Sequence, residues 1–213
     1  MSEHSSDVNM IMQISELEIG RKLKRSLGGS DLANLLHQYG WTPLGHGFEA
    51  GVAEHPRKSY VLKIFPKNSP YVHFVNLVQQ NPNNPHFPRF SRFVRQIPGT
   101  EYAYVRMEKL AKMLPYDLTQ FPSLLCLLDE MWFTHAAHAQ PPYWVRSSVS
   151  WDPHVVDTEG LIDCNQEAIT PQEKQAIQLL SNKVKEIGWT HVDLHSGNFM
   201  MRANTWVITD PFI

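Results

Sequence analysis

Two carboxylates and one amide near the end of the chain have the types and spacing needed for phosphoryl transfer. Asp193 and Asn198 lie within the run HVDLHSGN of residues 191–198, and Asp210 follows a short apolar run. Transfer of a phosphoryl group to a hydroxyl needs a carboxylate that accepts the hydroxyl proton, and oxygen ligands for the magnesium ions on the phosphates. Asp193 is the candidate proton acceptor, and Asn198 and Asp210 are the candidate metal ligands.

The segment between Asn198 and Asp210 predicts a small hairpin. Apolar pairs at residues 199–200 and 207–208 flank a polar turn at residues 202–204. Paired apolar stretches around such a turn are typical of two antiparallel strands. This hairpin would return Asp210 to the side of Asn198.

A second group of residues has the features of a phosphate site. Residues 44–52 contain three glycines between apolar residues. This pattern predicts a strand, a turn and a second strand, with a backbone that can close over phosphates. Residues 59–65 predict a strand with Lys63 in an apolar run. An unpaired buried ammonium group is costly, so this lysine must reach solvent or an anion. Lys63 is therefore the candidate phosphate ligand.

The order of these features resembles the protein-kinase-like superfamily. The form D-L-H-x-x-N at residues 193–198 is usual in relatives of aminoglycoside and choline kinases. A closer resemblance, over roughly residues 37–212, is to the early Ser/Thr protein kinases of short-tailed coliphages. It rests on residues 45–48, on Lys63, and most specifically on residues 193–200 and 208–211.

This resemblance implies an α+β fold, namely a two-lobed protein-kinase-like fold with a minimal, truncated C-lobe. Residues 1–40 would be an N-terminal helical extension, residues 41–110 an N-lobe with an antiparallel sheet and a helix, and residues 111–213 a mainly helical C-lobe with the catalytic loop. ATP and Mg²⁺ would be the cofactors. The activity implied is a serine/threonine protein kinase that acts on bacterial host proteins during infection.

The resemblance also implies a nucleotide site in the N-lobe. Strands are expected at residues 90–97 and 101–108, with a helix at residues 70–80 before them. Met107 would face the adenine, and backbone groups near Glu108 and Leu110 would bind its edge. The glycine loop would cover the phosphates through Gly45, His46, Gly47 and Phe48.

The chain departs from the usual kinase pattern in three ways. No Asp or Glu occurs between Lys63 and Arg89, so the helix cannot supply a glutamate partner. The candidates for orienting Lys63 are His73, Asn76, Gln79, Glu16 and Glu18. The metal motif is Asp-Pro-Phe at residues 210–212, and the chain stops at Ile213 without an activation segment. In a homodimer, the second copy of the chain could supply the side of the substrate site that the absent segment would otherwise form.

Further helices are predicted from apolar periodicity and from end signals. They are expected at residues 10–27, 31–39 and 121–139, with Gly40 ending the second. The best signal is at residues 170–187, where Thr170, Pro171 and Glu173 form a capping box and Gly188 ends the helix.

Composition limits the class of protein. Apolar residues make up 42% and charged residues 19% of the 213 positions, which is typical of a globular protein. A formal net charge of −2 gives no basic excess for nucleic-acid binding. Two cysteines, no signal-peptide pattern and no apolar run of spanning length predict a cytoplasmic protein, with no membrane partner.

Three alternatives remain open on the residues alone. A small-molecule kinase would share the same catalytic segment. A nucleotide-binding or AMP-transferring module would account for the missing glutamate. A metal-dependent hydrolase would use Asp193 with its sequence neighbours His191 and His195, together with the further pair His135 and His138 at helical spacing.

Overall fold

The computed structural model of the chain describes these residues: 7, 9–10, 36–46, 51–97, 101–113, 121, 169–188 and 198–212. They form a mixed α+β protein with antiparallel sheets. Two of the predicted helices, at residues 10–27 and 121–139, lie almost wholly outside this part of the chain, as does the segment 191–197. No helix of the described residues is long and apolar enough to cross a membrane.

The chain divides into two compact units. The first unit holds the described residues up to Pro82 together with Pro88–Lys109, and the second holds Asn83–Phe87 together with the described residues of Leu110–Phe212. The short segment 83–87 therefore belongs to the second unit although the first unit surrounds it in sequence.

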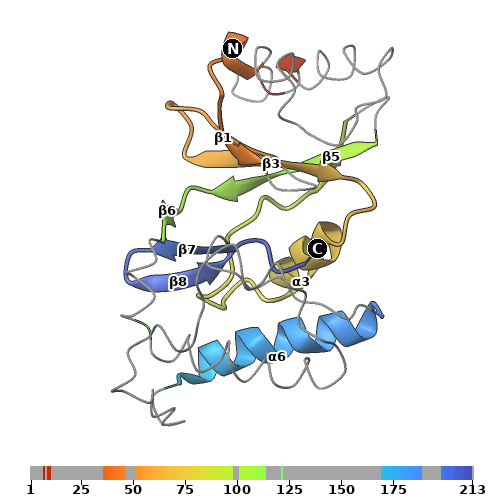
Figure 1. Cartoon of the computed structure of the whole chain (residues 1–213), viewed down its shortest axis with the longest axis vertical. Helices are drawn as coiled ribbons and strands as arrows, with labels where there is room; N and C mark the ends of the chain where they lie inside the picture. Colours follow the sequence, from red (N-terminus) through yellow and green to blue (C-terminus); the bar gives the residue numbers. More distant parts are fainter. Residues whose placement is uncertain are drawn as a thin grey trace, which may run out of the picture. The chain divides into compact units, whose positions relative to one another are not determined.

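The first unit is built on a five-stranded antiparallel sheet in the order β1-β2-β3-β5-β4 (Figure 1). Its strands are β1 (Thr42–His46), β2 (Gly51–Glu54), β3 (Tyr60–Pro66), β4 (Arg95–Gln96) and β5 (Tyr102–Glu108), and its helix is α3 (Tyr71–Gln80). The two paired strands predicted around the glycines, the lysine strand and the helix at residues 70–80 are thus confirmed.

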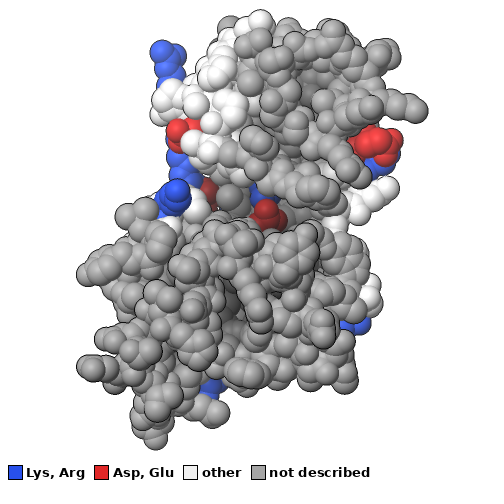
Figure 2. Space-filling model, in the orientation of Figure 1, with Lys and Arg blue, Asp and Glu red and all other residues white. Residues whose placement is uncertain are grey.

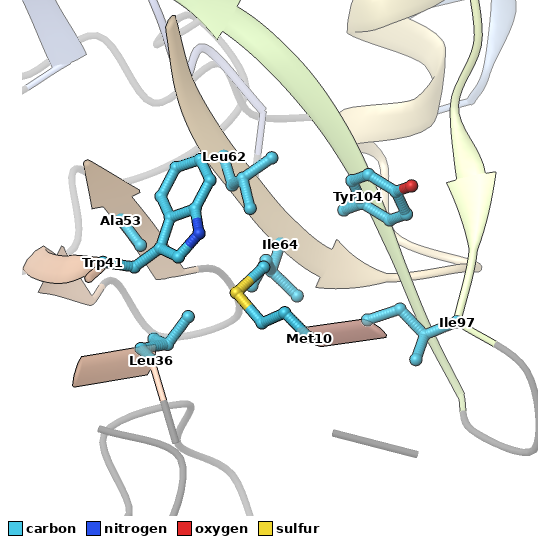
Figure 3. Packing of buried hydrophobic residues seen from close by; sticks show 8 residues of the cluster. All are labelled: Met10, Leu36, Trp41, Ala53, Leu62, Ile64, Ile97 and Tyr104. Carbon is cyan, nitrogen blue, oxygen red and sulfur yellow. The ribbon is translucent and has the colours of Figure 1, made fainter. Parts of the chain in front are cut away.

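Both faces of the central strand β3 are buried, which explains its almost unbroken apolar sequence. Leu62 and Ile64 join one apolar cluster, which Figure 3 shows. The cluster contains Met10, Leu36, Trp41, Ala53, Leu62, Ile64, Ile97 and Tyr104. Full burial of one such side chain contributes about 1.5–3 kcal/mol. Residues from the N-terminal extension therefore form part of the core of this unit.

The alternate side chains of β3 lie on the other face of the sheet. Phe65 packs against Tyr71 of α3, with a ring-centroid distance of 4.9 Å. Helix α3 buries Tyr71, Phe74, Val75, Leu77 and Val78. The helix ends at Asn81, whose side-chain amide donates to the carbonyl oxygen of Leu77 at 2.8 Å.

The expected continuous strand at residues 90–97 is wrong. Of residues 90–97, only Phe90 and the two residues of β4 pair with β5 in strand geometry. Ser91 still donates its N–H to the carbonyl oxygen of Arg106 at 2.8 Å, and Arg95 pairs with Tyr104. Residues 92–94 therefore face the single residue Val105, and this extra length forms a bulge in the ladder.

The second unit contains a three-stranded sheet in the order β6-β7-β8 and the helix α6. Its strands are β6 (Ala111–Lys112), β7 (Phe199–Arg202) and β8 (Thr205–Ile208), and the helix is α6 (Pro171–Glu186). The predicted hairpin at residues 199–208 is confirmed, with Ala203 in its turn at φ 50°.

Helix α6 begins with the predicted capping box. Thr170 accepts a hydrogen bond from the backbone N–H of Glu173 at 3.2 Å, and the Glu173 carboxylate accepts one from the N–H of Thr170 at 2.7 Å. Gly188 follows the helix at φ +70°, a conformation that glycine adopts without strain. Both end signals read from the sequence are confirmed.

Candidate functional site

Lys63 lies at the centre of the sheet in the first unit. In register it faces Val52 on β2 and Val105 on β5, and it is only 5% exposed. Its Nζ lies 4.7 Å from the centroid of the Tyr71 ring. A cation within about 6 Å of an aromatic face is attracted by the negative potential of the ring. The first turn of α3 therefore presents an aromatic face to the lysine.

Tyr71 is held firmly for this role. It is 1% exposed and packs edge-on against Phe74 and Phe90, with centroid distances of 5.7 and 6.1 Å. Its hydroxyl lies 3.9 Å from the sulfur of Met107, a weak hydrogen bond at most. Sequence reasoning missed Tyr71, and the only available signal was a tyrosine at the start of a helix that has no acidic residue.

Three of the residues predicted to orient Lys63 lie on α3 within the described part of the chain. His73 and Asn76 are exposed on α3. The side-chain amide of Gln79 donates to the carbonyl oxygen of Ser91 at 2.8 Å. Glu16 and Glu18 lie outside the described residues. The ring of Tyr71 is a contact that α3 makes with Lys63.

The segment predicted to bind adenine lies at the end of β5. Met107 is buried and pairs with Phe90, on the neighbouring segment. The N–H of Glu108 donates to the carbonyl oxygen of Arg89 at 3.0 Å, and its carboxylate accepts from the N–H of Arg89 at 2.7 Å. The N–H of Glu108 is therefore used in a hydrogen bond within the protein. Leu110, the first residue of the second unit after β5, is half-buried.

The glycine loop is described only at its edges. Gly45 and His46 end β1 and pair with Val52 and Gly51 of β2. The register of this pairing shifts between Pro43 and Gly45, so the strand is irregular where it approaches the turn. Gly47 and Phe48 lie outside the described residues.

The candidate metal ligands lie at the two ends of the β7–β8 hairpin in the second unit. Asn198 immediately precedes β7 and is 7% exposed. Its carbonyl oxygen accepts hydrogen bonds from the N–H of Thr209 at 2.8 Å and from the Thr209 hydroxyl at 3.1 Å. Asp210, the next residue, is half-buried. The hairpin therefore brings the backbone before Asp210 into direct contact with Asn198, as predicted, whereas Asp193 lies outside the described residues.

A buried polar cluster supports this hairpin. The ring of His86 stacks on Trp206 with centroids 3.9 Å apart, and its Nδ1 lies 3.0 Å from the carbonyl oxygen of Trp206. A carbonyl oxygen only accepts, so Nδ1 carries the proton. The N–H of Ile208 donates to the carbonyl oxygen of His86 at 3.0 Å. Burial lowers the pKa of His86 below its ordinary value, against the opposing effects of the Trp206 carbonyl and of Glu173.

Arg202 of β7 also joins the segment 83–87 to the hairpin. Arg202 donates from its two terminal nitrogens to the carbonyl oxygens of Pro85 and Phe87, both at 2.8 Å. The indole N–H of Trp206 donates to the Glu173 carboxylate at 2.9 Å. Since Glu173 also caps α6, the helix and the hairpin share one buried carboxylate.

The metal-hydrolase alternative depends on residues that the structure does not describe. His191, Asp193, His195, His135 and His138 all lie outside the described residues. Within the described part of the chain, no three His, Cys, Asp or Glu side chains form a group that could hold a metal ion.

Figure 2 shows one face of the molecule, on which some of the described lysine and arginine side chains lie close to described acidic ones. Comparison with models of known protein families gives no match, and no curated protein sequence is significantly similar to the chain.

Proposed function

We propose that this protein is an ATP-dependent phosphotransferase with a protein-kinase-like fold, and that it transfers the γ-phosphoryl group of ATP to a serine or threonine hydroxyl of a protein. Asp193 would orient the hydroxyl and accept its proton, and Asn198 and Asp210 would hold magnesium. Lys63 would bind the phosphates, and the glycine loop would cover them.

The observation that carries this proposal is the contact of Thr209 with Asn198. Magnesium demands a near-ideal octahedral shell with ligands at about 2.0–2.1 Å, and usually takes few of them from the protein. Two ligands from separate positions in the sequence can share one ion only if the backbone holds them together. The two hydrogen bonds from Thr209 to the carbonyl oxygen of Asn198 support this arrangement for Asn198 and Asp210.

The first unit supports the proposal through Lys63. A buried ammonium group in a central strand is costly unless it serves an anion or is otherwise stabilised. The ring of Tyr71 supplies part of this stabilisation without neutralising the charge, and Lys63 would contact a phosphate when ATP is bound. Tyr71 would thus take over, in part, the positioning role that a helix glutamate has in most kinases.

The acceptor and the setting follow from the resemblance to phage kinases. We infer that the acceptors are proteins of a bacterial host and that the protein acts in the cytoplasm. In a homodimer, the second copy of the chain would form one side of the substrate site.

The decisive experiment incubates the purified chain with γ-labelled ATP, magnesium and bacterial lysate. The wild type is compared with Asp193→Ala, Asp210→Asn and the matched control Glu186→Gln, whose side chain is 67% exposed. We expect Asp193→Ala to lose about two to four orders of magnitude in transfer, as expected for loss of a general base. It should retain ATP binding by isothermal titration, whereas Asp210→Asn should weaken magnesium-dependent binding, and the control should be unchanged.

Each alternative gives a different result. Full transfer activity in Asp193→Ala would contradict the catalytic assignment. ATP turnover without labelled protein would indicate a small-molecule kinase, and protein labelled from α-labelled ATP would indicate AMP transfer. Absence of ATP binding would contradict the kinase proposal and favour a metal-dependent hydrolase.

A further inference from the structure

The bulge opposite Val105 opens a small cavity at the edge of the sheet in the first unit. Residues 92–94 lie opposite the single residue Val105, so they cannot all pair with β5. A bulge of this kind interrupts the regular alternation of side chains along a strand. The cavity has a volume of about 80 Å³. Its lining residues are Ser91, Arg92, Phe93, Arg95, Tyr104 and Arg106.

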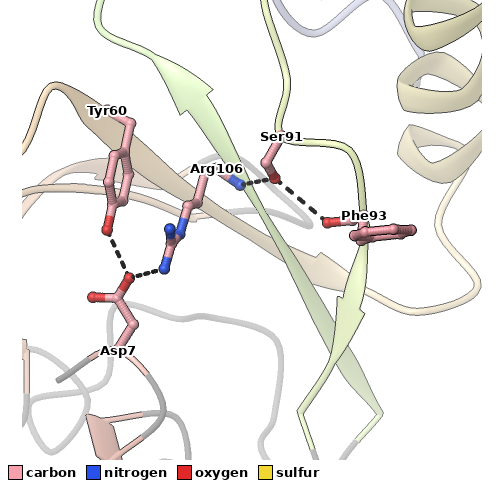
Figure 4. A network of polar contacts seen from close by, with 5 residues as sticks. All are labelled: Asp7, Tyr60, Ser91, Phe93 and Arg106. Carbon is pink, nitrogen blue, oxygen red and sulfur yellow. Dashed lines mark hydrogen bonds and ion pairs between the residues drawn. The ribbon is translucent and has the colours of Figure 1, made fainter. Parts of the chain in front are cut away.

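The lining of this cavity is strongly cationic. Three of its residues, Arg92, Arg95 and Arg106, are arginines, and no acidic residue is among the described residues that line it. Arg106 binds the buried carboxylate of Asp7 at 2.5 Å, and this pair is shown in Figure 4. Three guanidinium groups and one carboxylate leave a local charge of about +2.

A neutral donor also faces the cavity. Burial raises the pKa of Tyr104 above its ordinary value, although the nearby Arg95 and Arg106 act in the opposite direction. The hydroxyl of Tyr104 therefore stays protonated at neutral pH and can donate to an anion.

An exposed aromatic ring stands beside the arginines. Phe93 is 60% exposed, and the Arg92 guanidinium lies 5.4 Å from the centroid of its ring. The carbonyl oxygen of Phe93 accepts a weak hydrogen bond from the Ser91 hydroxyl at 3.5 Å, which holds the bulge at this residue (Figure 4). The rim of the cavity thus combines positive charge with an apolar surface.

We propose that this cavity binds the phosphate group of a phosphorylated serine or threonine in a protein segment, with an apolar neighbouring residue packed on Phe93. Guanidinium groups match phosphate oxygens with paired, charge-assisted hydrogen bonds. A phosphoserine carries a charge of about −1.5 to −2 at neutral pH, which matches the local charge of the cavity.

The size of the cavity sets the ligand class. A cavity that holds benzene has a volume of about 150 Å³, roughly twice the volume found here. A single tetrahedral phosphate group is therefore favoured over a nucleotide base. None of the proposed catalytic residues is among these lining residues, and the proposal does not depend on phosphoryl transfer.

The test is binding of a fluorescein-labelled peptide, with phosphoserine followed by leucine, measured by fluorescence anisotropy without ATP. The full chain is compared with Arg92→Gln/Arg95→Gln, with Phe93→Ser and with the control Arg57→Gln, which removes an exposed charge away from the cavity. All four positions are exposed, so the variants should fold. We expect the double variant to bind about tenfold more weakly, since it loses two exposed charge-assisted contacts. Phe93→Ser should bind about threefold more weakly, and the control should change by less than about twofold.

Three results would overturn the proposal. One is equal binding of the same peptide without its phosphate. Another is a loss in Arg57→Gln as large as in the double variant, which would indicate general charge attraction. The third is displacement of the labelled peptide by inorganic phosphate at the same concentration as by unlabelled phosphopeptide, which would show that the peptide portion contributes nothing.

Discussion

Replacement of Tyr71 by leucine should impair use of ATP far more than it impairs folding. The ring centroid of Tyr71 lies 4.7 Å from Nζ of Lys63, and the two residues are only 1% and 5% exposed. A desolvated cation–π contact contributes about 2 kcal/mol. Since about 1.4 kcal/mol corresponds to a tenfold change, we expect kcat/KM for ATP to fall about 30-fold in Tyr71→Leu.

A second substitution at the same position isolates the ring. Tyr71→Phe keeps the aromatic face and loses only the hydroxyl, whose contact with the sulfur of Met107 is long at 3.9 Å. Its kcat/KM should stay within about threefold of the wild type, because a weak O–H···S contact contributes little.

The matched control for packing is Phe74→Leu. Phe74 is fully buried on the same helix and packs against Tyr71 and Phe90. Both leucine variants should lower the free energy of unfolding by about 2–3 kcal/mol, because a buried ring is replaced by a smaller side chain. Thermal unfolding followed by circular dichroism measures this loss, and steady-state kinetics with varied ATP are run well below both midpoints.

The kinetic difference between the two leucine variants decides the matter. If Phe74→Leu lost as much kcat/KM as Tyr71→Leu, the effect would come from loosened packing and not from the lysine. If Tyr71→Leu kept wild-type kcat and KM for ATP, the positioning role of Tyr71 would be refuted.

Three further predictions concern stability. Glu173→Ala should lower the free energy of unfolding by about 2–3 kcal/mol in urea, since it removes the carboxylate half of the capping box and leaves the buried indole N–H of Trp206 unpaired. The control Glu186→Ala, at an exposed ion pair, should lower it by under about 1 kcal/mol. The pKa of His86 is lowered in the folded state, so the stability that neutral His86 contributes is fully present above about pH 6.5 and is lost as the pH falls through the folded pKa. The melting temperature of His86→Gln should therefore fall less than that of the wild type when the pH is lowered below about 6.5. Asp7→Ala should destabilise the first unit by about 2–3 kcal/mol, because the partly buried cation of the network in Figure 4 loses its carboxylate, and an unchanged thermal midpoint would contradict this.

Sequence alone predicted the elements whose signals are local. The capping box at Thr170 and Glu173 and the glycine at 188 define α6 because they satisfy the helix ends within a few residues. The hairpin around Ala203 follows from a polar turn between apolar pairs. Since a hairpin pairs its own two ends, the proximity of Asn198 and Asp210 could also be predicted.

The strand at residues 90–97 shows where local signals failed. Its apolar residues satisfy a strand pattern, but pattern alone does not count the residues on the opposite strand. Phe90 and Arg95 both pair with β5, and the residues between them outnumber those on the facing part of β5. The extra residues must therefore leave the sheet. The cationic cavity exists only because of that surplus.

The prediction of phosphoryl transfer came from residue types and spacing alone, namely the carboxylates, the amide and Lys63. The surroundings of Lys63 depend on tertiary packing. The approach of Tyr71 to Lys63 depends on how α3 packs on the sheet, and the membership of residues 83–87 in the second unit depends on the contacts of His86 and Arg202. Such contacts join residues far apart in the chain, and no local propensity encodes them because their free energy arises only when separate elements are packed together.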